Sequence, residues 1–154
     1  MENSKHIFVQ IDTDGIIREK EVLKALKKAD DKKGIFEIIR GYTTIYDQGT
    51  MVMGYPIKTF TIDILPGQEV YFTILPAKLY SHHKLYFDGF ECTTEIGLRI
   101  PDLSSQHELS FKVTASDNVN GTESTEFCLS AVLEYEGEDS IVLLIDPVIQ
   151  VVQD

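Results

Sequence analysis

The chain has 154 residues, of which 43% are hydrophobic, and this composition predicts one folded domain, spanning residues 1–154, with a core of its own. Its 25 acidic and 14 basic residues give a formal net charge of −11, which argues against nucleic acid as a partner because phosphate binding requires clustered Lys and Arg. The same charge argues against anionic membranes, and no apolar run approaches the roughly 20 residues that a membrane-spanning helix needs.

The amino-terminal residues and the cysteines predict the cellular compartment. The stretch MENSKHIFVQID has no long apolar run, so we expect no secretory signal peptide. Cys92 and Cys128 lie far apart in the sequence, without a spacing typical of a disulfide framework, and we expect both to be reduced thiols. These features predict a cytoplasmic protein.

Apolar periodicity predicts one helix and a series of strands. Residues 6–12 are rich in β-forming residues and predict a strand. Residues 19–29 place apolar side chains on one helical face, which predicts the single helix that we expect in this chain; these are Val22, Leu23, Leu26 and Ala29. After Gly34 the sequence predicts strands separated by polar turns, over residues 35–46, 58–65, 69–75, 84–90, 107–114, 123–135, 140–145 and 148–152.

Alternating apolar residues in these strands predict which side chains face the core. The inward sets are Phe60, Ile62 and Ile64; Leu109, Phe111 and Val113; and Phe127, Leu129, Ala131 and Leu133. About eight short strands at close spacing are typical of two packed sheets. We therefore predict an all-β protein, an antiparallel β-sandwich of the jelly-roll kind, with one short helix near the amino terminus.

The stretch QIDTDGIIREKE, residues 10–21, has most of the spacing of a calcium-binding EF-hand loop. Asp12, Asp14 and Glu21 occupy the third, fifth and twelfth positions of such a loop, and Gly15 occupies the sixth. However, the first position is a glutamine, and a strand is predicted where an EF-hand requires a helix. We favour a strand end, a turn over residues 12–15 and then a helix with Asp14 near its start, where a carboxylate accepts from free N–H groups. Calcium binding through the three carboxylates is kept as an alternative.

Other residues that could carry chemistry form no recognisable catalytic arrangement. The sequence has no GxSxG, GxGxxG or GxxxxGK[ST] motif, so we expect no enzymatic activity and no cofactor. His82 and His83 would point to opposite sides of an extended segment, which disfavours a shared metal ion. Asp117, Asn118 and Asn120 lie in a polar loop and suit either a tight turn or the binding of sugar hydroxyls, so a carbohydrate is an alternative partner.

Three stretches together resemble the AidA/PixA family of bacterial inclusion-body proteins. The first is the opening strand that runs into the Asp-Thr pair at residues 12–13, and the second is the pair of strands around the Pro-Gly turn at 66–67. The third is the closing part, in which residues 115–123 precede a long strand ending in LEY and then IDPVIQV at 145–151. The charged segment 18–33 departs from the family, whose members usually have a loop rich in Pro and Asn there.

The resemblance implies a β-sandwich, a cytoplasmic bacterial protein, self-association as a homodimer or larger oligomer, and no catalysis. One segment of the chain is apolar, lacks clear alternation and is rich in adaptable Met, which makes it a candidate surface for self-association. The same residues also fit ordinary core or loop. The candidates are Tyr42, Ile45, Tyr46, Met51, Val52 and Met53.

Overall fold

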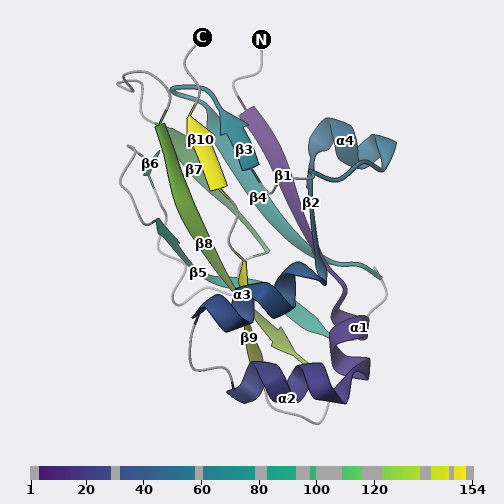
Figure 1. Cartoon of the computed structure of the whole chain (residues 1–154). Helices are drawn as coiled ribbons and strands as arrows, with labels where there is room; N and C mark the ends of the chain where they lie inside the picture. Colours follow the sequence, from purple (N-terminus) through teal and green to yellow (C-terminus); the bar gives the residue numbers. More distant parts are fainter. Residues whose placement is uncertain are drawn as a thin grey trace.

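The computed structural model describes residues 4–28, 32–57, 61–78, 83–92, 98–99, 109–115, 123–135, 140–145 and 148–151. Within these ranges the chain forms two β-sheets and four helices (Figure 1). The prediction of a strand-rich protein with two sheets is therefore confirmed, whereas the prediction of a single short helix is wrong.

Five strands build the first sheet: β1 (Ser4–Ile11), β2 (Thr43–Asp47), β4 (Glu69–Pro76), β6 (Leu98–Arg99) and β7 (Ser110–Ala115). They lie in the order β2-β1-β4-β7-β6. β1 runs antiparallel to β2 and parallel to β4, and β4 runs antiparallel to β7. This order makes β2 one edge of the sheet.

The second sheet is formed by β3 (Thr61–Ile64), β5 (Lys84–Cys92), β8 (Glu123–Glu134), β9 (Ile141–Ile145) and β10 (Val148–Val151). The long strand β8 is its centre. β5 lies antiparallel along one side of β8, while β10 and β9 pair antiparallel with successive parts of its other side. β3 extends the sheet beyond β10.

The prediction of a purely antiparallel sandwich is wrong at two places. β1 lies parallel to β4, and β3 lies parallel to β10. Parallel neighbours need a long crossover connection, and the chain between β1 and β4 supplies one that contains helices and two further strands. Local alternation fixes which side of a strand is buried, but it does not determine which distant strand lies beside it.

The core lies between the two sheets and is filled by the inward-facing sets. The predicted residues on β3, β7 and β8 whose side chains are described are buried: Ile62, Ile64, Phe111, Val113, Leu129, Ala131 and Leu133. The ring of Phe111 stacks on Phe72 with centroids 5.3 Å apart and meets the edge of Phe87 from the second sheet at 4.9 Å. Phe60 and the side chain of Phe127 lie outside the described part of the chain.

Leu109 corrects the predicted alternation. It is 57% exposed, although it shares its spacing with the buried Phe111 and Val113. β7 begins only at Ser110, so Leu109 precedes the strand and contributes a backbone carbonyl, which accepts a hydrogen bond from the Ile74 N–H at 2.9 Å. A periodic pattern therefore extended one residue beyond the element that produces it.

Four helices are present in the described residues: α1 (Thr13–Arg18), α2 (Lys20–Lys28), α3 (Lys32–Arg40) and α4 (Gln48–Met53). The predicted helix over 19–29 is confirmed as α2, whose Leu26 is buried and whose Val22 and Leu23 pack against the core. α2 and α3 pack against β9 at one end of the molecule, and α4 projects beside β2 (Figure 1). None of the helices in the described ranges is long and apolar enough to cross a membrane.

The predicted strand over 35–46 is wrong in its first half. Residues up to Arg40 form α3, and the strand begins at Thr43. Ile35, Ile38 and Ile39 have the i, i+3, i+4 spacing of one helical face, and this face packs on the core. Tertiary packing therefore overrides the strand preference of β-branched residues in this segment.

Candidate functional site

The segment after β2 turns back on itself as a well-capped helix. Asp47 ends β2 and caps α4, because its Oδ1 accepts a hydrogen bond from the Thr50 N–H at 2.8 Å while Thr50 Oγ1 accepts from the Asp47 N–H at 3.1 Å. The Thr50 backbone N–H holds the pKa of the Asp47 carboxyl below its ordinary value of 3.8, against the opposing effect of partial burial. Gly54, at φ 81°, ends the helix in the left-handed region.

This turn also occupies the open edge of β2. The Asp12 N–H donates to the Tyr42 carbonyl at 2.9 Å, and hydrogen-bonded pairs alternate with non-hydrogen-bonded pairs along β1 and β2. In this register the backbone N–H and C=O groups of Ile45 and Asp47 point away from β1. The Ile45 carbonyl accepts from the Ile57 N–H at 2.6 Å, and the hydroxyl of Thr50 bonds to the outward groups of Asp47. The outer edge of β2 is thus partly covered by its own chain, which hinders pairing with another strand.

The structure divides the predicted self-association residues between core and surface. Ile45 is fully buried in the core, and Tyr42, Tyr46 and Met51 are partly buried. Val52 and Met53, by contrast, are 86% and 69% exposed on α4. Two of the six predicted residues therefore present large apolar side chains to solvent.

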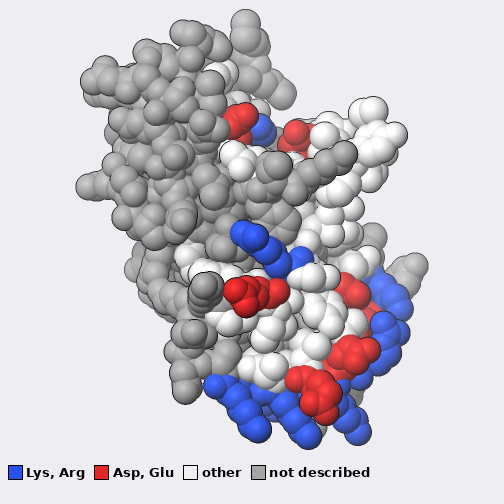
Figure 2. Space-filling view, in the orientation of Figure 1, with Lys and Arg blue, Asp and Glu red and all other residues white. Residues whose placement is uncertain are grey.

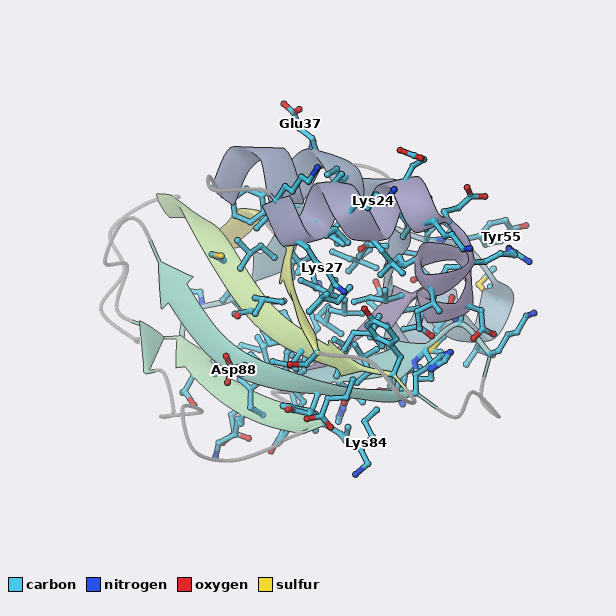
Figure 3. The ribbon with its side chains drawn as sticks, turned by 90° about the horizontal axis from the view of Figure 1, so that it is seen from below. Lys24, Lys27, Glu37, Tyr55, Lys84 and Asp88 are labelled. Atoms are coloured by element: carbon cyan, nitrogen blue, oxygen red, sulfur yellow. The ribbon has the colours of Figure 1, made fainter. Side chains whose placement is uncertain are left out.

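Tyr55 joins Val52 and Met53 in what we call the α4 patch. Its side chain is 63% exposed and points away from the body of the molecule (Figure 3). Residues 48–57 contain no Asp, Glu, Lys or Arg, and the surface over α4 is correspondingly free of charge colours in Figure 2. Tyr55 was not among the residues predicted for self-association, although its place between Gly54 and Pro56 is typical of an exposed turn.

The EF-hand-like stretch forms no EF-hand loop. β1 precedes it, and the chain is already helical from Thr13. A strand end followed by a helix is confirmed, but the helix already begins at Thr13, within the predicted turn. Its N-cap is Asp12, which accepts from the Gly15 N–H at 3.0 Å. Glu21 lies exposed in the first turn of α2.

Asp14 makes a connection that the sequence analysis missed. Its Oδ1 lies 3.2 Å from His83 Nε2 at the start of β5, and its Oδ2 lies 3.8 Å from Lys78 Nζ. The carboxylate therefore ties α1 to the two ends of the β4–β5 connection. In the described residues no three or more His, Cys, Asp or Glu side chains are grouped as a metal site.

Two predictions depend on parts of the chain that are only partly described. Asp117, Asn118 and Asn120, the predicted sugar-binding residues, lie outside the described residues. Cys92 and Cys128 prove to lie on neighbouring strands, where Cys92 opposes Phe127 and Cys128 opposes Glu91. Residues far apart in sequence are thus one register position apart across β5 and β8.

The fold of this chain, but not its sequence, is similar to that of a known protein. No protein-family model matches the chain, and no curated protein sequence matches it. A crystal structure of an inclusion body protein, PixA, from Burkholderia cenocepacia J2315 has the same fold, with a TM-score of 0.56 at 12% sequence identity. The match covers 100% of this chain and 97% of that protein. The resemblance to the AidA/PixA family is therefore confirmed at the level of the fold.

Proposed function

We propose that this chain is a non-enzymatic cytoplasmic protein that associates with copies of itself, as an inclusion-body-type protein does. One observation carries the proposal: the fold matches an inclusion body protein from end to end, with nearly the whole of both chains covered. The match runs over the full length of this chain, so it concerns the chain as a whole rather than one part of it.

Two features of the chain support the proposal. The sequence lacks the motifs that position a nucleophile or a nucleotide phosphate. Large apolar side chains stand exposed on a capped helix, and exposed apolar patches commonly mark interaction sites. Chemistry at a reacting centre therefore has less support than assembly through a surface.

Light scattering coupled to size-exclusion chromatography tests the proposal. We expect a mass of at least twice the 17.4 kDa of one chain at tens of micromolar, decreasing toward one chain on dilution. A mass of one chain at every concentration up to about 100 µM would contradict self-association at physiologically relevant strength.

A further inference from the structure

We infer that the α4 patch, formed by Val52, Met53 and Tyr55, is the surface through which two copies of this chain meet, patch against patch about a twofold axis. The inference rests on the proposed self-association and adds where and by what kind of contact it occurs. Among the described residues, these three are the most exposed of the large apolar side chains. All three fall within four consecutive positions of the chain. Elsewhere in the described part such side chains are scattered singly, as at Leu65, Leu109 and Val142.

The patch is presented by a locally fixed helix. The reciprocal hydrogen bonds of Asp47 and Thr50 hold its start, and the Tyr55 N–H donates to the Thr50 carbonyl at 2.8 Å to close its end. This bond holds the backbone of Tyr55 against the end of the helix that carries Val52 and Met53. A preorganised apolar surface loses little conformational entropy on binding.

The lack of charge in residues 48–57 makes the α4 patch a place where two acidic copies can meet. The chain carries a net charge of −11, so two copies repel each other over most approaches. Residues 48–57 contain no charged side chain, and a twofold contact places each patch against itself. An uncharged patch meets this requirement without opposing like charges. A basic partner would instead be drawn to the acidic surface, and an anionic membrane would repel the chain.

Hydrogen bonding at β2 favours side-chain packing over strand addition. Exposed sheet edges usually recruit further strands through their free N–H and C=O groups. Here the Ile45 carbonyl accepts a hydrogen bond from the Ile57 N–H. The Thr50 hydroxyl accepts from the Asp47 N–H and donates to the Asp47 carbonyl. A second copy approaching this side of the molecule therefore meets the side chains of α4 before it meets a free edge.

The decisive variant is Val52→Ser combined with Met53→Ser, compared with Val142→Ser by sedimentation velocity. Val142 is 47% exposed on β9, so its substitution removes the same kind of exposed side chain at an unrelated position. We expect the double variant to raise the dissociation constant of the oligomer at least about tenfold, with the control within about twofold of the wild type. Met53→Glu, which sets like charges against each other across the twofold contact, should be monomeric under the same conditions.

Salt dependence distinguishes this contact from a charged one. Raising NaCl from about 50 mM to about 500 mM screens the repulsion between copies, so the association should strengthen or stay constant. A contact through the exposed lysines of α2, seen at the lower end of Figure 2, would weaken instead, and that result would overturn the inference.

The outcomes separate the inference from the proposed function. A wild-type protein that assembles together with a folded double variant that assembles equally well would overturn the α4 contact and leave self-association standing. A wild-type protein that stays monomeric in both salt conditions would overturn the proposed function and the inference with it. Circular dichroism of each variant, matching the wild type, establishes that a change in mass is not a loss of fold.

Discussion

Gly15 illustrates how a missing side chain permits the first turn of α1. A Cβ atom at this position would lie 2.8 Å from Asp12 Cγ, closer than such atoms can approach. The same Asp12 carboxylate caps the helix by accepting from the Gly15 N–H at 3.0 Å. The cap and a larger residue at position 15 therefore compete for one space.

This competition predicts a coupling between the two residues. Gly15→Ala gains helix propensity, but in the wild type it must displace the Asp12 carboxylate and lose the cap. In an Asp12→Ala background there is no cap to lose. We expect Gly15→Ala to be about 1 kcal/mol less favourable in the wild type than in that background, measured by urea unfolding in a double-mutant cycle. Equal effects in the two backgrounds would show that the carboxylate and the Cβ do not compete.

Residue-scale predictions from the sequence succeeded where the cause was local. A helix start after β1 was predicted correctly, because a short carboxylate at this point satisfies free N–H groups whatever the rest of the fold does; the capping residue is Asp12 rather than Asp14. The contact of Asp14 with His83 could not be predicted, because it depends on where the β4–β5 connection passes α1. The prediction that Leu109 faces the core was wrong for a related reason, because the start of β7 is set by its pairing with β4.

At the scale of elements, α4 depends on the charge of Asp47. The hydrogen bond from the Thr50 N–H favours the ionised carboxylate and lowers its pKa in the folded state. A carboxyl with a lowered folded pKa contributes stability above its ordinary value of 3.8, and this contribution is lost as pH falls through the folded pKa. Lowering the pH through the folded pKa of Asp47 should therefore weaken the cap of α4.

The corresponding test compares the wild type with Asp47→Asn and Asp47→Ala. At pH 7 we expect Asp47→Ala to lower the free energy of unfolding by about 0.5–2 kcal/mol, and Asp47→Asn, which keeps a capping oxygen, to lower it less. The difference between wild type and Asp47→Asn should shrink as the pH falls below 3.8. Denaturant unfolding at several pH values measures this, and a pH-independent difference would rule out a role for the ionised carboxylate.

The helices α3 and α4 show why element types were harder to predict than the strands. The strands with strict alternation, such as β3 with Ile62 and Ile64, were predicted because one polar and one apolar side define them locally. α3 is apolar and β-branched, so its strand preference and its helical spacing conflict. α4 is held by an Asp–Thr box rather than the usual glutamate or glutamine at the third position, which hid its start.

At the scale of the whole molecule, the two parallel pairs separate what the sequence determines locally from what it does not. Both β1 with β4 and β3 with β10 join segments distant in the chain. Three short stretches in the right order were nevertheless enough to indicate the fold, because they fall on β1, on the β3–β4 turn and on the closing strands of the second sheet. The residues of the interaction surface were harder to predict from the sequence. Of the six candidate residues, Ile45 is buried in the core, whereas Val52 and Met53 are exposed to solvent.

Hydrogen–deuterium exchange of the wild-type protein over a concentration series tests the central claim most directly, because it reports both whether copies associate and where. Between about 1 µM and about 100 µM we expect slower exchange in peptides covering residues 48–57, together with unchanged exchange around Val142 on β9. Exchange that does not depend on concentration anywhere in the chain, or protection that appears only outside residues 48–57, would contradict the account.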